Sequence, residues 1–247
     1  MSIKTTLNYS PSFNSKKRKF KQIRFIVFHY TGMKKESEAI SRLTNIQSQV
    51  SCHYLIKKNG EIITMVPESY IAWHAGKSSW GNCKSLNKNS IGIEITNPGH
   101  EFKYKKFTEK QINTLLKLSR YLIKKYNISL KNILGHSDIA PERKKDPGEN
   151  FPWQYLSEYK VGLWHTIKKQ ELIKNRKIKS IKIDKNLFIN NLFKIGYSKK
   201  KPRTLSKNKY LDYIIKAFQR RYRQSLIDGK IDQECLIISQ NLIKKFY

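Results

Sequence analysis

Hydrophobic and polar positions in the first two thirds of the chain follow two periods, one typical of strands and one typical of helices. Short apolar runs predict strands at about 23–29, 52–58, 61–66 and 90–96. Asn59-Gly60 separates two of these runs and is a strong signal for a hairpin turn. The pattern up to about Trp164 therefore predicts a mixed α/β layer in which helices pack on a central sheet.

Two amphipathic helices are predicted in the same part of the chain. One lies near 36–46, and the other begins after Thr108. Thr108 and Gln111 have the spacing of a capping box, and an apolar stripe follows from 115 to 123. These helices complete the predicted fold class, a mixed β-sheet flanked by helices.

The last third of the chain has a different pattern. Residues from about 167 to 184 are rich in lysine and carry no motif, which predicts a linker or a connecting helix. Residues 185–247 have helical periodicity and are expected to form a small three-helix domain with a core of its own, although a domain of this size has a marginal core. The expected division is a domain over 1–166, a linker over 167–184 and a helical domain over 185–247.

Composition limits the function classes. The chain has 247 residues and a formal net charge of +32, which first suggests nucleic acid as a partner. The lysines are spread along the chain and accompany abundant isoleucine and asparagine, so we interpret most of the charge as solvated surface and disfavour nucleic acid. No apolar run approaches the length of a membrane span. The three cysteines are widely spaced and do not suggest a disulfide framework.

The segment 135–148 carries the most informative chemistry. It contains His136 and, ten positions later, Asp146, while two prolines and two glycines predict a shaped loop rather than a helix. Imidazole and carboxylate groups suit a divalent metal such as zinc. His29, at the end of the first predicted strand, is the candidate third ligand. Three protein ligands leave one position open for water, as catalytic zinc sites do.

With these residues in place, the sequence resembles the zinc-dependent N-acetylmuramoyl-L-alanine amidases of the AmpD/AmiD type, which are relatives of phage amidases and of peptidoglycan recognition proteins. The segments that carry the resemblance, in the order of the family, are 26–31, 50–56, 72–76, 90–95 and 136–148. The sequence at 93–99 is closer to the AmiD branch than to the cytosolic recycling branch. The resemblance implies hydrolysis of the amide that joins the lactyl group of N-acetylmuramic acid to the L-alanine of the stem peptide, with peptidoglycan or muropeptides as the partner.

The resemblance also assigns roles to individual residues. It implies one zinc ion bound by His29, His136 and Asp146, and catalytic work for Glu94 and Lys144. A carboxylate such as Glu94 can take a proton from water and return it to the leaving amine, and Lys144 can stabilise an oxyanion. Glu94 stands inside an apolar run, where an unpaired charge is costly, and this favours a functional role over a solvated strand end.

Several further residues have open interpretations. Lys145 adjoins Lys144 and can in principle exchange roles with it. Some relatives have a tyrosine where Cys52 stands and lack the acid, so we interpret Cys52 as small and structural. His53 alternates with apolar neighbours, which favours a core residue or a support for the site over a ligand.

The segment around Trp73, His74 and Ala75 borders the substrate groove in the family, so these three residues are candidate substrate contacts. For His74, a supporting role behind the site is an equal alternative. His100 and His165 belong to no recognisable constellation and are assigned no role.

In the helical region, the order of motifs resembles a peptidoglycan-binding module. The segments are 187–197, the Ala-Phe-Gln sequence at 217–219 and the Asp-Gly sequence that begins at 228. The resemblance implies attachment to the cell wall, and we expect a chain that ends near Ser180 to keep its activity on soluble muropeptides. The alternative is an appendage that only stabilises the enzyme.

Other questions stay open at this point. A wall-binding domain favours the cell envelope, whereas the absence of an apolar signal segment in the first residues favours the cytosol. Two other classes remain as alternatives, a non-catalytic peptidoglycan-recognition protein and a basic nucleic-acid-binding protein. The sequence does not indicate an oligomeric state or the form of the substrate.

Overall fold

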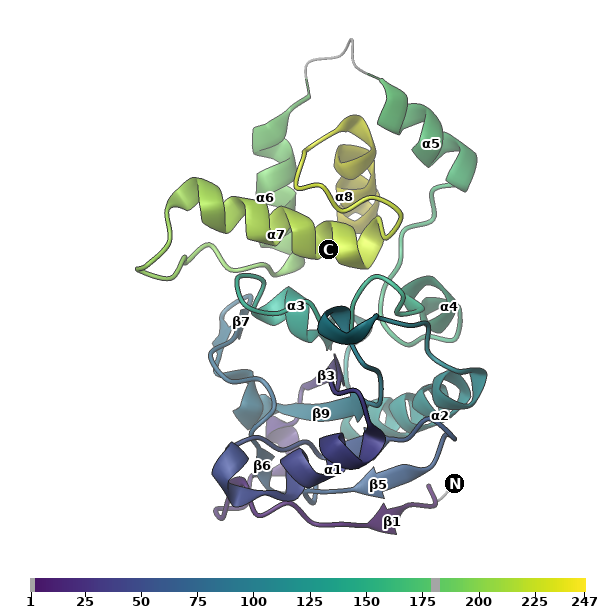
Figure 1. The fold of residues 1–247 in the computed structure, drawn as a ribbon. Helices are drawn as coiled ribbons and strands as arrows, with labels where there is room; N and C mark the ends of the chain where they lie inside the picture. The colour runs from purple at the N-terminus through teal and green to yellow at the C-terminus, as the bar shows by residue number, and fades with distance from the viewer. Residues whose placement is uncertain (1–2, 179–182) are drawn as a thin grey trace.

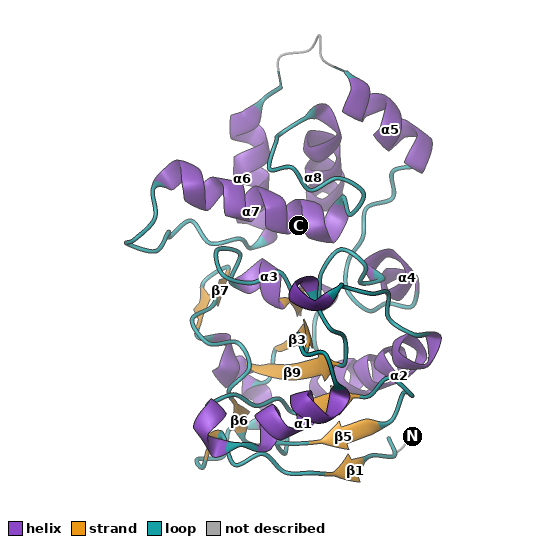
Figure 2. Cartoon of the chain, in the orientation of Figure 1, coloured by secondary structure: helices purple, strands orange, loops and turns teal. Residues whose placement is uncertain are grey.

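The computed structural model describes residues 3–178 and 183–247. In Figure 1 an α/β half that contains the sheet lies below a helical half, and Figure 2 shows the strands confined to the first of these halves. Within the described residues the main sheet has six strands in the order β1-β5-β4-β9-β3-β10. In that order the strands are Thr6–Leu7, Ile62–Thr64, Tyr54–Ile56, Ser90–Ile95, Phe25–Tyr30 and Ile133–Gly135. Two small antiparallel pairs are β2 (Phe13–Asn14) with β6 (Ile71–Ala72), and β7 (Ser79–Trp80) with β8 (Cys83–Lys84).

The sheet is mixed, as expected. Strands β4, β9, β3 and β10 run parallel to one another, and β5 runs antiparallel to β4. The turn at Asn59-Gly60 joins β4 to β5, and the Lys57 amide donates to the Glu61 carbonyl at 2.9 Å. The predicted hairpin is therefore confirmed, and each of the four predicted strands is present in a shorter form.

Helix α2 (Glu109–Tyr126) covers one face of the sheet, and helix α1 (Glu36–Thr44) packs on part of the other. The predicted capping box is confirmed, because the Gln111 amide donates to the Thr108 hydroxyl at 3.2 Å and the Thr108 amide donates to the Gln111 side chain at 3.0 Å. Alternate residues of a strand point to opposite faces. The isoleucines of β9 pack with α2, so Gly92 and Glu94 point to the opposite face. That face carries the candidate site.

The segment after β10 differs from the prediction of a loop without helix. Its first residues form one helical turn, α3 (His136–Ile139). The Gly135 amide donates to the Asp138 carboxylate at 2.8 Å, and the Ala140 amide donates to the His136 carbonyl at 3.0 Å. A side-chain acceptor at the start of the turn thus satisfies an amide that has no partner within the helix, and Pro141 follows where the turn has ended. Further along lies α4 (Trp153–Glu158).

The helical half contains α5 (Lys169–Lys177), α6 (Lys185–Ile195), α7 (Lys207–Tyr222) and α8 (Gln233–Phe246). Helix α5 lies in the segment expected as a linker, of which residues 179–182 are outside the described part of the chain. It is attached to α8 by an ion pair between Arg176 Nε and Glu234 Oε2 at 2.6 Å. Short 3-10 helices elsewhere span Phe20–Gln22, Ile46–Ser48, Leu86–Asn89, His100–Phe102 and Leu130–Asn132.

The expectation that the helical region has a core of its own is wrong. One continuous cluster of buried side chains joins Phe188, Phe218 and Leu242 of the helices to Val27 of β3 and Ile139 of α3. In Figure 1, α7 lies directly above α3. A unit of about sixty residues buries too little apolar surface by itself to be more than marginally stable, and here the α/β half supplies the missing contacts.

The Ala-Phe-Gln and Asp-Gly motifs have structural roles in this half. Gln219 is fully buried, its Nε2 donates to the Lys230 carbonyl at 2.8 Å, and its Oε1 accepts from the Asp228 and Gly229 amides at 3.0 and 2.8 Å. The two motifs therefore hold α7 to the following loop.

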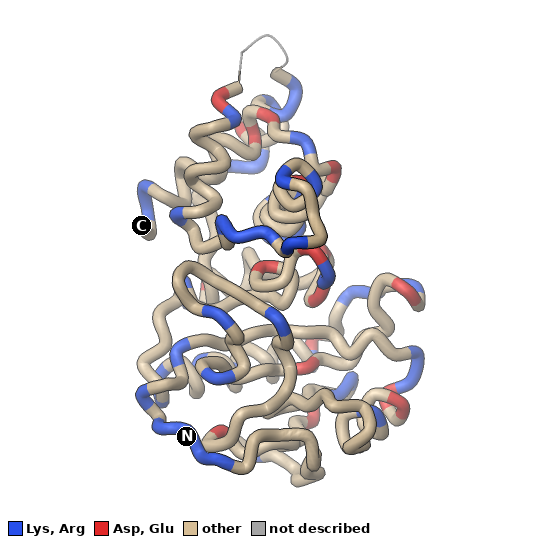
Figure 3. Tube along the Cα trace, turned by 90° about the vertical axis from the view of Figure 1, so that its left-hand side faces the viewer, with Lys and Arg blue, Asp and Glu red and all other residues tan. Residues whose placement is uncertain are grey.

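The lysine and arginine positions, blue in Figure 3, occur over both halves of the chain, in agreement with the interpretation of a dispersed charge. None of the helices in the described residues is both long enough and apolar enough to span a membrane.

Candidate active site

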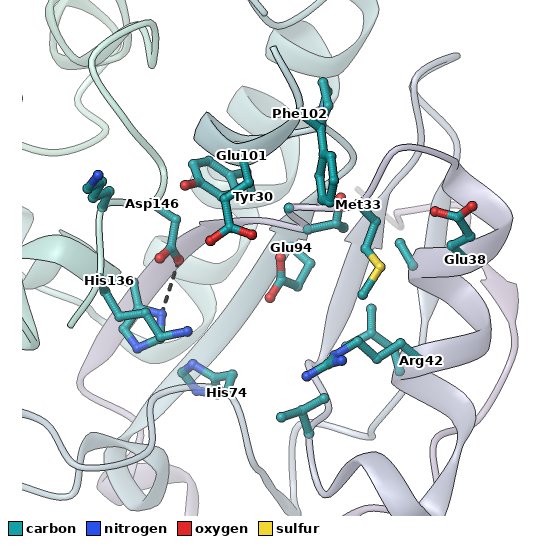
Figure 4. Close-up of a pocket in the computed structure, with 18 of the residues that line it drawn as sticks. Tyr30, Met33, Glu38, Arg42, His74, Glu94, Glu101, Phe102, His136 and Asp146 are labelled. Atoms are coloured by element: carbon teal, nitrogen blue, oxygen red, sulfur yellow. Dashed lines mark hydrogen bonds and ion pairs between the residues drawn. The ribbon is translucent and has the colours of Figure 1, made fainter. Parts of the chain in front are cut away.

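A cavity of about 770 Å³ opens on the face of the sheet opposite α2. In Figure 4, His136 and Asp146 form one side of it, Glu38 and Arg42 of α1 form the other, and the Glu94 carboxylate points into the space between them. Sequence segments far apart along the chain therefore meet in one pocket.

His29, His136 and Asp146 present one atom each to a common point. The Nδ1 atoms of the two histidines are 3.0 Å apart, and each is 3.0 Å from Asp146 Oδ2. All three side chains are buried. The structure thus brings together the three ligands expected from sequence, in a triangle small enough for one ion with bonds of about 2 Å to reach every corner.

Hydrogen bonds behind His29 fix which of its nitrogens carries the proton. The Ser90 hydroxyl donates to the Leu86 carbonyl at 2.6 Å, so its oxygen accepts from His74 Nε2 at 3.0 Å. His74 Nδ1 is then the acceptor for His29 Nε2–H, at 3.0 Å. This chain of bonds leaves the lone pair of His29 Nδ1 directed at the triangle.

The second histidine is held in the same tautomer. His136 Nε2 lies 3.3 Å from the carbonyl of Ala75, which can only accept, so Nε2 carries the proton. Both hydrogens of Arg143 Nη2 are taken by the carbonyls of Ala75 and Lys77, at 2.5 and 2.7 Å. The triangle is therefore made of two imidazole lone pairs and a carboxylate oxygen, a donor set that fits a divalent cation such as zinc.

The pKa values agree with this arrangement. Burial lowers the pKa of His29 to about 4, with a further contribution from the charge of His136, so the ring is neutral near pH 7. Burial by itself raises the pKa of Asp146, but the closeness of His136, and then of His29, brings it well below its ordinary value. Neutral imidazoles and an ionised carboxylate are the forms that bind a metal.

Gly92 makes room for the support behind His29. A methyl group at this position would lie 2.3 Å from Cγ of the His74 ring. A glycine in the middle of strand β9 therefore allows the imidazole of His74 to lie flat against the sheet, between Ser90 and His29.

Glu94 lies beside the triangle because β9 and β3 pair in parallel with Glu94 opposite His29. Among residues 3–178 and 183–247, its Oε2 atom has no hydrogen-bond partner. Burial, and then the charge of Asp146, raise the pKa of Glu94 well above its ordinary value. A half-buried carboxyl group that has an unpartnered oxygen and faces a cavity is a typical arrangement of a general base.

The lysines of the loop are placed differently from one another. Lys144 and Lys145 both line the cavity. Lys144 is half-buried, and its charge helps to lower the pKa of both His29 and Glu94. Lys145 is exposed. This supports Lys144 as the cation next to the site.

Of the expected substrate contacts, Trp73 and His74 line the cavity. Trp73 is held by its indole N–H, which donates to Asn14 at 2.6 Å. The methyl group of Ala75 is fully buried, and this residue faces the site through its carbonyl. His74 is mostly buried and bonded to His29, so it reaches the site from behind.

The remaining polar candidates lie around the site. Cys52 is buried with its Sγ 3.6 Å from Met65 Sδ, and burial raises the pKa of its thiol, so it behaves as a core residue. The ring of His53 is fully buried, and its Nδ1 accepts from the Gly92 amide at 3.0 Å. His100 lines the cavity, with Nδ1 2.9 Å from the Tyr30 hydroxyl oxygen.

Sequence reasoning missed Ser90, Gly92 and Arg143. Ser90 and Gly92 were part of the segment 90–95 that carries the family resemblance, but their roles depend on the position of His74 across the sheet. In the sequence, Arg143 looks like one more surface cation. In the structure, its guanidinium group joins the loop after β10 to the segment around Ala75.

Comparisons with known proteins agree with this geometry. The family model of N-acetylmuramoyl-L-alanine amidases (Amidase_2) matches residues 19–149. The chain is 34% identical over 239 residues to the N-acetylmuramoyl-L-alanine amidase AmiD of Escherichia coli, covering 92% of this chain and 84% of that protein. It is 41% identical over 105 residues to the 1,6-anhydro-N-acetylmuramyl-L-alanine amidase AmpD of Citrobacter freundii, covering 42% of this chain and 54% of that protein.

Two solved structures extend the likeness to the fold. One is the complex of E. coli AmiD with anhydro-N-acetylmuramic acid-L-Ala-D-gamma-Glu-L-Lys, with a TM-score of 0.78 and 33% identity, covering 91% of this chain and 90% of that one. The other is AmpDh3 from Pseudomonas aeruginosa in complex with anhydromuramic pentapeptide, with a TM-score of 0.78 and 30% identity, covering 96% of this chain and 97% of that one. Both alignments include the helical half as well as the α/β half.

Proposed function

The chain belongs to the N-acetylmuramoyl-L-alanine amidase family and is a hydrolase of that class, and we propose that it works with one zinc ion bound by His29, His136 and Asp146. The observation that supports this most directly is the triangle of two imidazole nitrogens and a carboxylate oxygen at 3.0 Å separations, open to a cavity. When bound, zinc supplies positive charge that polarises a carbonyl and acidifies water.

In this proposal the residues of the chain divide the chemistry of amide hydrolysis. Water adds to the lactyl carbonyl of N-acetylmuramic acid, the bond to the nitrogen of L-alanine breaks, and a carboxylate and an amine are released. Glu94 takes the proton from the attacking water and returns it to the leaving amine. Its raised pKa suits a group that must both accept and donate near neutral pH.

Lys144 lies at the edge of the same space and would stabilise the oxyanion that forms at the carbonyl carbon. Trp73 would contact the substrate from the neighbouring wall, whereas His74 would support the site from behind through His29. The complexes of AmiD and AmpDh3 contain anhydromuramic peptides, so a muropeptide of this kind is the proposed ligand of the cavity here.

We further propose that the helical half, residues 185–247, holds the enzyme on polymeric peptidoglycan. The resemblance to a wall-binding module supports this role, and the net charge of +32 adds a salt-sensitive attraction to polyanionic wall material. A second contact on the same chain raises the effective concentration of the active site at the wall.

The proposed function is tested by mass spectrometry of purified muropeptides after incubation with the protein. We expect a free stem peptide and a free muramic acid sugar, no products after treatment with a chelator, and products again after zinc is added back. A folded, zinc-loaded protein that binds muropeptides without cleaving them would instead be a recognition protein. Cleavage that persists in the chelator would show that the reaction does not need the metal.

A further inference from the structure

Asp138, two residues after His136 in the turn α3, connects the candidate metal site to the helical half. Its carboxylate is buried and accepts three hydrogen bonds. The Gly135 amide donates at 2.8 Å, Arg221 Nη1 of α7 donates at 2.5 Å, and the hydroxyl of Tyr197, just after α6, donates at 2.9 Å. Two of the three donors therefore come from the helical half.

Arg221 is buried and is held through both of its Nη atoms. Only 2% of it is exposed, and its Nη2 donates to the carbonyl of Ile133 at 2.9 Å. Its guanidinium group lies over the ring of Trp153, 4.1 Å from the centroid. Ile133 is in β10, which pairs with the strand that carries His29. One side chain from α7 thus contacts both the strand next to His29 and the turn that carries His136.

Tyr197, which follows α6, anchors the same turn from a second part of the helical half. Its ring packs edge-on against Trp80 at a centroid distance of 5.0 Å. The Gly81 amide donates to the carbonyl of Gly196 at 2.6 Å, and a methyl group on Gly196 would collide with the Trp80 ring. The end of α6 is therefore seated closely on the α/β half.

The turn α3 also determines where the two ligands of its loop lie relative to each other. The amide of Ser137, between His136 and Asp138, donates to the carbonyl of Asp146 at 2.8 Å. A displacement of this turn would therefore move His136 and release Asp146 at the same time.

We propose that Arg221 and Tyr197 are positioning residues for the metal site, so that the helical half is part of the catalytic unit as well as a wall contact. This inference rests on the proposed metal site. It replaces the expectation that a chain ending near Ser180 keeps its activity on soluble muropeptides, because that chain would lose both donors to Asp138.

Helix α7 supplies a matched control. Arg223, directly after α7, is another buried arginine, and it pairs with Asp228 and Asp232 of its own half. Loss of Arg223 weakens the helical half without removing a donor to Asp138.

The experiment measures the zinc dissociation constant of the full chain by competition with a chromogenic chelator, together with its thermal unfolding. Tyr197→Phe keeps the ring and removes a single hydroxyl, and Arg221→Met removes the charge. We expect each to raise the dissociation constant roughly tenfold, the lower end of what the loss of an outer partner of a metal site costs. Arg223→Met should lower the unfolding temperature and leave zinc affinity within about twofold of wild type.

A second readout does not depend on zinc. In the metal-free protein, hydrogen exchange at the Ser137 amide should become faster in Tyr197→Phe and Arg221→Met and stay slow in Arg223→Met. Unchanged zinc affinity and unchanged exchange in folded Tyr197→Phe would overturn the inference, whether or not Arg221→Met folds. If wild type binds no zinc at His29 and His136 but exchange at Ser137 still responds, the proposed metal site fails while the mechanical link stands.

Discussion

Two buried polar clusters in this protein differ in how completely their groups are paired. In the helical half, Arg223 is paired with Asp228 at 2.7 Å and with Asp232, and Gln219 bonds the loop that contains Asp228. In the α/β half, the lone pairs of His29 and His136 converge with Asp146. Nearby, within the described chain, one oxygen of Glu94 has no partner.

This difference distinguishes a cluster that stabilises the fold from a cluster that can bind a cation. A buried cluster whose donors and acceptors are matched can be explained by stability alone. A cluster in which acceptors face acceptors carries an electrostatic cost that a bound cation removes. Buried charge alone would not distinguish the two sites, whereas the count of satisfied groups does.

The largest expected effect follows from removing a ligand from the cluster of His29, His136 and Asp146, which we call the open cluster. His136→Ala should lose bound zinc and all measurable amidase activity, because two remaining ligands cannot hold the ion in an open site. Metal analysis and a muropeptide cleavage assay measure both. The corresponding change in the paired cluster of Arg223, Asp228 and Asp232 is Arg223→Met. It should cost about 3–5 kcal/mol of folding free energy and keep the zinc. Equal zinc loss in both variants would remove the distinction between the clusters.

The next effect concerns chemistry without loss of metal. Glu94→Gln and Lys144→Ala should keep the zinc and lose on the order of a hundredfold or more in turnover, as expected for a general base and for an oxyanion stabiliser. Lys145→Ala is the matched control, since Lys145 is exposed, and should stay close to wild type. Near-normal turnover of Glu94→Gln at saturating substrate would mean that another group takes the proton.

Glu94 should also affect the stability of the metal-free protein. Its pKa is higher in the folded state than in the unfolded chain, so the folding free energy that it contributes is present at low pH and is lost as pH rises through the folded pKa. Glu94→Gln should therefore be more stable than wild type at pH 7, by roughly 1.4 kcal/mol for each unit of the pKa difference that lies below pH 7, and equal to it below about pH 4. Denaturant unfolding at both pH values measures this, and a variant less stable at pH 7 would contradict it.

The smallest effect concerns the support behind His29. Ser90→Ala removes the acceptor for His74 Nε2–H, so the tautomer of His74 is no longer fixed. The tautomer of His29, whose Nε2–H bonds to His74, is then no longer fixed either. We expect zinc affinity to fall about tenfold. Long-range proton–nitrogen NMR spectra of the metal-free protein should show His29 protonated at Nε2 in wild type and a mixture of tautomers in the variant. A variant with a wild-type spectrum and affinity would show that Ser90 is not needed.

The sequence was sufficient to predict the central strands, α1 and α2, and it singled out His29, His136 and Asp146, which the structure brings together. His29 and Glu94 end up side by side because they occupy equivalent places on two apolar runs, and a parallel pairing of those runs brings them together. The candidate ligands were recognisable as a set, because two imidazoles and a carboxylate together suit a divalent metal.

The contacts that hold the site could not be predicted in the same way. Arg221 is 83 positions from Asp138 and stands among many other basic residues, so nothing in its local pattern marks it as buried. The core of the helical half was expected to be separate because periodicity reports which face of a helix is apolar and not what covers it. That face is covered by β3 and α3, which become its neighbours only after the chain has folded.

The central claim is that the open cluster is a catalytic metal site. It is tested most directly by the zinc content of the folded His29→Ala, His136→Ala double variant, purified beside wild type and Arg223→Met. We expect one zinc ion per chain in wild type and in Arg223→Met, and none in the double variant. Stoichiometric zinc in a folded double variant would contradict it.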